Sequence, residues 1–232
     1  MKAFCRVVVI VLFVLRSSAY AEAPLPDQKE FMPESGKGRV VIVVSGTTGT
    51  YHYQTYAKHI AEQGYYAVLV DSNDFWKKED GGGKDLLRGV IERAQQSSKA
   101  LPGKVAVIGF SLGGGVSLNF ATKMPDLVSA VVVNYPLTNF IKNPKDYVSK
   151  FKVPTLMIAG GHDTFKNCCR IEKAHELDDA ARAYDGNAMF KLVVYPGAEH
   201  AFDIISEKAY RMSDADDAFH RALDFLRERM GT

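Results

Sequence analysis

The sequence predicts an α/β fold in which a mostly parallel β-sheet is flanked by helices, compact and with no large lid domain. Three observations predict it: short apolar runs typical of strands buried on both faces, amphipathic segments between them, and no insertion long enough for a second domain. The chain has 232 residues, of which 47% are hydrophobic and 24% charged, a composition that suits one globular domain with a full core.

Six segments are predicted to be strands because they are short, aliphatic and mostly apolar on both faces. They are 40–45, 67–71, 104–108, 128–134, 155–159 and 190–195. Five amphipathic segments of helical length alternate with them: 53–63, 84–99, 112–123, 168–184 and 214–230. This alternation is typical of βαβ units with right-handed crossovers, which build a parallel sheet.

The N-terminus has the pattern of a secretory signal peptide over residues 1–21. Lys2 and Arg6 precede the apolar run 7–15, and small residues follow as far as Ala21. Nine apolar residues fall short of the ~20 that span a bilayer. We therefore expect cleavage after Ala21, no stable membrane anchor, and export to a bacterial periplasm or the extracellular space. Residues 22–38 are predicted to be an irregular lead-in and 39–232 the single α/β domain.

The charge pattern argues against nucleic acid as a partner. Loss of residues 1–21 removes three cations and no acid, which changes the formal net charge from +2 to −1. No basic cluster interleaved with aromatic residues appears in the mature chain, so we expect no nucleic-acid binding.

The mature chain keeps two cysteines, Cys168 and Cys169, which are adjacent. Adjacent cysteines cannot link distant segments, and they lack the spacing of a zinc pair. We expect no metal and no cofactor. Three alternatives stay open for the cysteines: buried thiols, a vicinal disulfide, or a bond between chains.

The strongest chemical signal is Gly109-Phe110-Ser111-Leu112-Gly113, a Gly-x-Ser-x-Gly motif between a predicted strand and a predicted helix. In that context the serine sits on a sharp turn, where flanking glycines avoid clashes. The helix N-terminus beside it favours a developing negative charge. Ser111 is therefore the predicted nucleophile.

An acid and a histidine follow at the ends of two later strands, in the chain order that α/β-hydrolases use. Asp163 follows the strand 155–159, and His200 follows the strand 190–195. Because the carboxyl ends of parallel strands meet at one edge of a sheet, both residues are expected beside Ser111. His200 would act as the base, and Asp163 would orient it.

Two backbone N–H groups are predicted to hold the oxyanion of the reaction. One is that of Leu112, directly after the nucleophile, and the other is that of Thr47, in the glycine loop after the strand 40–45. Aromatic and polar residues near the strand ends are predicted to bind substrate: Tyr51, His52, Trp76 and Tyr135.

These motifs resemble the dienelactone hydrolase family within the α/β-hydrolases. The likeness covers about residues 40–202 and rests on Gly-Phe-Ser-Leu-Gly-Gly-Gly at 109–115, Gly-Gly-His-Asp at 160–163 and Pro-Gly-Ala-Glu-His-Ala-Phe at 196–202. Two positions depart from the family. Ser111 stands where dienelactone hydrolases carry a cysteine, and Ile204 stands where they carry a substrate-binding arginine. The resemblance therefore implies the fold and the triad, and not dienelactone as substrate.

Together these features predict an exported serine hydrolase that cleaves a small carboxylic ester or lactone through an acyl-enzyme on Ser111. Two alternatives stay open. One is a peptidase or amidase of the same fold, and the other is a non-catalytic binding protein that retains the fold.

Overall fold

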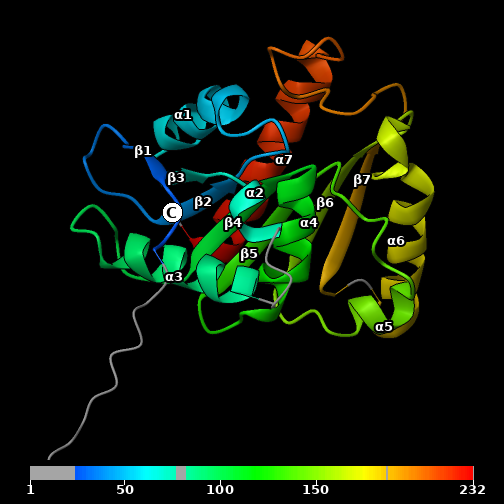
Figure 1. The fold of residues 1–232 in the computed structure, drawn as a ribbon, viewed down its shortest axis with the longest axis horizontal. Helices are drawn as coiled ribbons and strands as arrows, with labels where there is room; N and C mark the ends of the chain where they lie inside the picture. Colours follow the sequence, from blue (N-terminus) through cyan, green and yellow to red (C-terminus); the bar gives the residue numbers. More distant parts are fainter. Residues whose placement is uncertain (1–23, 77–81, 187, 232) are drawn as a thin grey trace, which may run out of the picture.

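The computed structural model describes residues 24–76, 82–186 and 188–231, so the predicted signal peptide lies outside the described residues. The described residues form one seven-stranded sheet in the order β1-β3-β2-β4-β5-β6-β7 (Figure 1). The strands are β1 (Gln28–Phe31), β2 (Val40–Val44), β3 (Tyr66–Val70), β4 (Val105–Phe110), β5 (Val128–Asn134), β6 (Thr155–Gly160) and β7 (Phe190–Tyr195).

The helices lie between the strands along the chain. They are α1 (Gln54–Glu62), α2 (Asn73–Trp76), α3 (Gly82–Gln96), α4 (Leu112–Asn119), α5 (Pro144–Val148), α6 (Ile171–Asp185) and α7 (Met212–Met230). Short 3₁₀ turns occupy η1 (Tyr51–Tyr53), η2 (Ala121–Lys123) and η3 (Phe165–Asn167). Among the described residues, no helix has both the length and the apolar character needed to cross a membrane.

The strands from β2 to β7 pair in parallel, and β1 pairs antiparallel with β3. Side chains of β2 alternate between the two faces: Val40, Ile42 and Val44 pack on one side, and Val41 and Val43 on the other. All five are buried, which explains why such strands appear in the sequence as unbroken apolar runs. The predicted mostly parallel sheet flanked by helices is confirmed.

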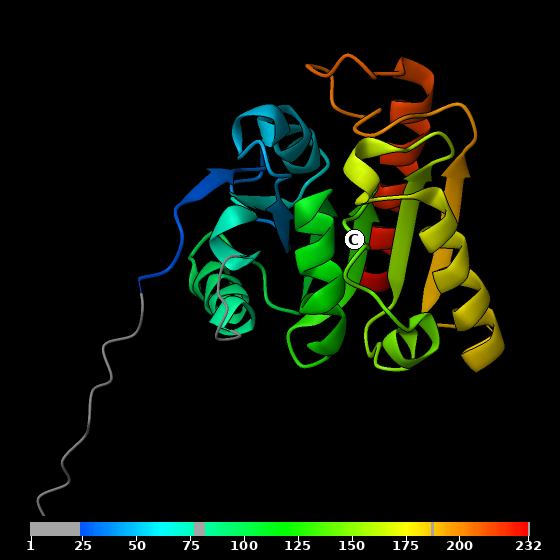
Figure 2. The same cartoon turned by 45° about the vertical axis from the view of Figure 1, so that its right-hand side comes forward.

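Helices cover both faces of the sheet (Figure 2). On one face, Leu87 and Ile91 of α3 and Leu177 of α6 are fully buried in one apolar cluster. On the other face, Ile60 of α1 and Leu226 of α7 are fully buried in a second cluster. The sheet is thus the middle of three layers, and the loops at the carboxyl ends of its strands are left to carry chemistry.

The structure differs from the sequence prediction in short elements that have no clear pattern in the sequence. Residues 28–31 form β1 within a segment that was predicted to be irregular. Lys29 and Glu30 are exposed, so this strand lacks the apolar run that marks the others. The helices α2 and α5 have four and five residues, too few to show a helical periodicity in the sequence.

Candidate active site

Ser111 occupies the turn between the end of β4 and the start of α4. Its backbone has φ 51° and ψ −113°, a conformation that side-chain-bearing residues rarely adopt. A Cβ on Gly109 would lie 2.3 Å from the carbonyl oxygen of Gly113, and a Cβ on Gly113 would lie 2.3 Å from that of Ser45. The two glycines of the motif are therefore required by close backbone contacts.

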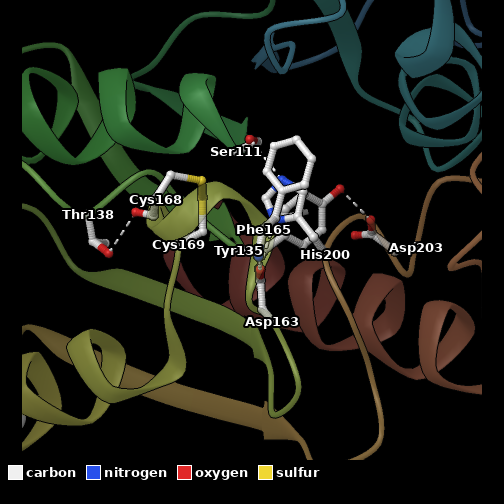
Figure 3. Close-up of polar contacts among 9 residues, drawn as sticks. All are labelled: Ser111, Tyr135, Thr138, Asp163, Phe165, Cys168, Cys169, His200 and Asp203. Carbon is white, nitrogen blue, oxygen red and sulfur yellow. Dashed lines mark hydrogen bonds and ion pairs between the residues drawn. A yellow bond between two sulfur atoms is a disulfide. The ribbon is translucent and has the colours of Figure 1, made fainter.

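A continuous set of hydrogen bonds joins the three predicted triad residues (Figure 3). His200 Nε2 lies 3.0 Å from Ser111 Oγ, and His200 Nδ1 lies 2.7 Å from Asp163 Oδ2. Both are ordinary hydrogen-bond distances. Ser111 and Asp163 are buried, with 6% and 2% of their surface exposed. The loops after β4, β6 and β7 thus bring these side chains to one point.

The loop that carries Asp163 also supplies an aromatic cover for the histidine. Asp163 Oδ1 accepts a hydrogen bond of 3.0 Å from the backbone N–H of Phe165. The Phe165 ring stacks on the His200 ring, with centroids 4.5 Å apart and planes 7° from parallel. Sequence reasoning did not single out Phe165, because it follows the acid in a loop without periodicity.

Cys168 and Cys169, in the same loop, are joined by a vicinal disulfide, one of the three alternatives left open by the sequence. The N–H of Cys168 donates to the Phe165 carbonyl at 3.0 Å. The N–H groups of Thr138 and Asn139 donate to the Cys168 carbonyl at 2.9 and 3.1 Å. The disulfide segment therefore links the loop after β6 to the loop after β5.

A second ring contacts the histidine from the end of β5. The Tyr135 and His200 ring centroids are 4.7 Å apart with planes at 65°. The Tyr135 hydroxyl donates to Asp203 Oδ1 at 2.6 Å. Burial raises the pKa of the Asp203 carboxyl to about 7 and raises the pKa of Tyr135 well above its usual value.

A cavity of about 620 Å³ opens beside Ser111 and His200. Its lining includes Thr47, Tyr53, Phe165, Glu207, Lys208 and Arg211. This volume is in the range of small-molecule sites. The last three residues come from the loop between β7 and α7, which the sequence did not mark, and they bring charges of both signs to the cavity.

The predicted oxyanion donors lie close to the nucleophile. Leu112 is the first residue of α4, and the first N–H groups of a helix have no acceptor within it. Thr47 lines the same cavity as Ser111.

None of the four predicted substrate-binding residues is among those that line this cavity. Tyr135 is 1% exposed and its ring contacts His200 instead. Tyr51 is 76% exposed, and its ring contacts that of His52. His52 Nδ1 lies 2.8 Å from Ser206 Oγ, and the residue faces a neighbouring cavity. Trp76 packs on Phe140, with ring centroids 5.2 Å apart. Nearness to a strand end did not indicate where these side chains point.

Within the described part of the chain, no group of three or more His, Cys, Asp or Glu side chains is arranged to hold a metal ion.

Comparison with known proteins shows the family to which the chain belongs. The sequence pattern described as "Dienelactone hydrolase family" matches residues 72–230. The chain belongs to the dienelactone hydrolase family. The sequence-based expectation of this family, and of a hydrolase, is confirmed.

Relatives of this dienelactone hydrolase family member extend over most of its length. A protein of Escherichia coli K12 named "Putative carboxymethylenebutenolidase" is 26% identical over 243 residues, covering 89% of this chain and 86% of the relative. A solved structure titled "Putative Dienelactone Hydrolase", from Klebsiella pneumoniae, has a TM-score of 0.72 at 23% identity and covers 88% of this chain and 100% of that one.

A second solved structure, a dienelactone hydrolase-like promiscuous phosphotriesterase from metagenomic libraries, has a TM-score of 0.71 at 15% identity. It covers 87% of this chain and 92% of that one. These structures confirm the predicted α/β-hydrolase fold.

Proposed function

We propose that this chain is an exported serine hydrolase that cleaves small carboxylic esters or lactones through an acyl-enzyme on Ser111. Family membership supports the ester or lactone bond as the target. The observation that carries the proposal is the unbroken hydrogen-bond path from Ser111 through His200 to Asp163.

Each group in this path has one part in the reaction. His200 Nε2 takes the proton of Ser111 while the hydroxyl oxygen attacks the carbonyl carbon, and Asp163 stabilises the resulting imidazolium. The tetrahedral oxyanion accepts hydrogen bonds from the N–H groups of Leu112 and Thr47. The ester C–O bond then breaks, and His200 returns its proton to the leaving oxygen. Water repeats the sequence on the acyl group and frees Ser111.

The volume of the cavity favours a small substrate. About 620 Å³ accommodates a short acyl chain with its leaving group. The arginine that dienelactone hydrolases are expected to carry four positions after the histidine is Ile204 here, buried to 2% exposure. We infer that the substrate differs from dienelactone at this end.

Export is supported by the N-terminal pattern and by the cysteines. Residues 1–21 have the charge, apolar run and small residues of a signal peptide. A disulfide persists in oxidising compartments such as a periplasm or the extracellular space. N-terminal sequencing of the protein recovered from the periplasm or medium of a bacterial host is expected to begin at Glu22. Recovery of the uncleaved chain from the cytoplasm alone would contradict export.

The proposed nucleophile is tested with p-nitrophenyl acetate and p-nitrophenyl butyrate. Turnover by the mature protein is expected, and Ser111→Ala is expected to lower kcat by about 10⁴-fold or more because no nucleophile is left. Circular dichroism and melting temperature are expected to show that the variant is folded.

A fluorophosphonate probe separates the remaining alternatives. Labelling of Ser111 without ester turnover, together with cleavage of a peptide or amide, would favour the amidase alternative. Neither labelling nor turnover in the wild type would favour a binding protein and contradict the proposed function.

A further inference from the structure

Tyr135 and Asp203 form a pair beside the histidine that the proposed mechanism does not use. Tyr135 is 1% exposed, and its hydroxyl donates to Asp203 Oδ1 at 2.6 Å. Its ring lies against His200, at a centroid distance of 4.7 Å. Figure 3 shows the rings of Tyr135, Phe165 and His200 together, with the Tyr135 hydroxyl directed to Asp203. One hydrogen bond and one ring contact therefore connect Asp203 to the imidazole.

Asp203 is a buried acid that lacks a compensating cation among the described residues. Its Oδ2 is buried and accepts no hydrogen bond from them. A carboxylate in such surroundings is costly unless it is paired, and burial accordingly raises its pKa to about 7. A costly group of this kind, hydrogen-bonded to a tyrosine that packs on His200, indicates a role beyond folding.

The groups around Asp203 show which charge can balance it. Tyr135 is hydrogen-bonded to Asp203, and the titratable side chains that line the same cavity as Asp203 are His52, Tyr56, His59, Tyr210 and Asp216. The Asp203 charge also raises the pKa of Tyr53, and His200 contacts the Tyr135 ring. Glu207, Lys208 and Arg211 follow in the same loop and line the Ser111 cavity, where Arg211 pairs with Asp214. No lysine or arginine is among the groups that shift the pKa of Asp203. A histidine cation is therefore the compensating charge that this set supplies, and His200 is the histidine that Tyr135 connects to Asp203.

We propose that Asp203 is a positioning residue that acts through Tyr135 to hold the His200 ring in place and to favour its cationic form during turnover. This inference rests on the proposed role of His200 as the base. Asp163 supplies one negative charge to the imidazolium at Nδ1. Ionised Asp203 supplies a second negative charge, whereas protonated Asp203 supplies none.

The test is the ratio of wild-type to variant kcat/KM for p-nitrophenyl acetate between pH 5.5 and 9. Asp203→Asn keeps the size of the side chain and an oxygen acceptor for Tyr135, and it removes only the charge. The ratio is expected to be near 1 at pH 5.5, where Asp203 is protonated in the wild type. It is expected to rise to about 10 at pH 8.5, where the wild type has gained the second charge.

Tyr135→Phe tests the connection, because it keeps the ring against His200 and removes the hydrogen bond to Asp203. That hydrogen bond lowers the pKa of Asp203, so its loss delays ionisation to higher pH. The ratio for this variant is expected to be largest near pH 7 to 8, where Asp203 is ionised in the wild type and still protonated in the variant.

Asp217→Asn is the matched control. Tyr195 donates to Asp217 Oδ2 at 2.5 Å, a second tyrosine–aspartate pair, and Asp217 does not line the Ser111 cavity. Its ratio is expected to stay near 1 at every pH. The rate of fluorophosphonate labelling of Ser111 gives the same comparison without an ester substrate.

A ratio for Asp203→Asn that does not change with pH, whatever its size, would mean that Asp203 is merely structural and would overturn the inference while leaving the proposed function intact. A wild type that neither turns over ester nor labels at Ser111 would overturn both. If Asp203→Asn does not fold, Tyr135→Phe decides alone, and a flat ratio for it overturns the inference.

Discussion

Two acids near His200 differ in their surroundings although both are aspartates. Asp163 is 2% exposed and accepts hydrogen bonds on both oxygens, from His200 and from the N–H of Phe165. Asp203 has one oxygen bonded to Tyr135 and one buried oxygen without a hydrogen bond from the described residues. The surroundings of each side chain, and not its type, therefore make the roles of Asp163 and Asp203 different.

The raised pKa of Asp203 makes a prediction about stability. The folded protein binds this proton more tightly than the unfolded chain, since the pKa is about 7 when folded and 3.8 ordinarily. Stability from this group is therefore full below about pH 4 and is lost as pH rises through 7. The wild type is therefore expected to lose about 2–3 kcal/mol of unfolding free energy relative to Asp203→Asn when the pH rises from 5 to 8.

Urea denaturation of both proteins at pH 5 and pH 8 measures this loss, with Asp217→Asn as the control. Hydrogen bonds from Tyr195 and Arg221 lower the pKa of Asp217, so the control is expected to show no change relative to the wild type over this range. An equal stability difference between the wild type and Asp203→Asn at the two pH values would show that Asp203 does not titrate there.

At the scale of residues, the sequence predicted the site residues that belong to motifs at the ends of strands. Ser111, Asp163 and His200 each follow a mostly apolar strand, so their places along the sheet edge could be inferred. Phe165 and Asp203 could not be found this way. Phe165 matters through its contact with His200, a residue distant in the chain. Asp203 matters through its hydrogen bond with Tyr135 and through burial that only the folded loop creates.

At the scale of elements, the loop between β6 and α6 combines several constraints on the site. It begins with Asp163, stacks Phe165 on the histidine and contains the Cys168–Cys169 disulfide before α6 begins. Lys166 and Asn167 between them have φ values of 47° and 53°, a region that residues with side chains rarely adopt. The loop therefore needs support from outside its own backbone preferences.

Reduction of the disulfide is expected to weaken this support. Treatment with a phosphine, followed by its removal under anaerobic conditions, is expected to lower kcat/KM by about 2- to 10-fold, because the loop that holds Asp163 and Phe165 gains freedom. Thiol titration before and after treatment confirms the state of the two cysteines.

The double variant Cys168→Ser with Cys169→Ser is the control for this treatment. It is expected to have the reduced activity from the start and to be indifferent to the phosphine. Equal activity of the oxidised, reduced and doubly substituted proteins would show that the disulfide does not support the site.

At the same scale, the sequence predicted six strands and five helices near their observed positions, because most of them are either apolar runs or amphipathic segments. It missed β1, where Lys29 and Glu30 are exposed and antiparallel pairing with β3 supplies the strand. Pairing with a distant partner leaves no local pattern in a four-residue segment. The part played by the loop between β7 and α7, which brings Lys208 and Arg211 to the cavity, was missed because an irregular loop has no periodicity to mark it.

At the scale of the whole molecule, one sheet is shared by two apolar layers. Leu87 lies fully buried in the layer of α3, and Leu226 lies fully buried in the layer of α7. Because both layers pack on the same strands, loss of either is expected to destabilise the entire sheet. The loops that carry Ser111, Asp163 and His200 lie at the edge of this common support.

Leu87→Ala and Leu226→Ala are each expected to lower the unfolding free energy by about 2–5 kcal/mol, through lost burial and the cavity that is left. Urea unfolding followed by circular dichroism and by Trp76 fluorescence is expected to show one coincident transition in the wild type and in both variants. Separate transitions for the two probes in either variant would contradict the shared support.

The outer strands of the sheet have a further consequence for how copies of the protein meet. Among the described residues, β1 is an outer strand that carries exposed Lys29 and Glu30, and Glu30 is also paired with Lys99 at 2.5 Å. On the opposite edge, Lys191 of β7 is exposed. Bare strand edges recruit strands from other chains, and charged side chains oppose that recruitment. We therefore expect concentrated solutions of the folded protein to resist joining sheet to sheet into fibres.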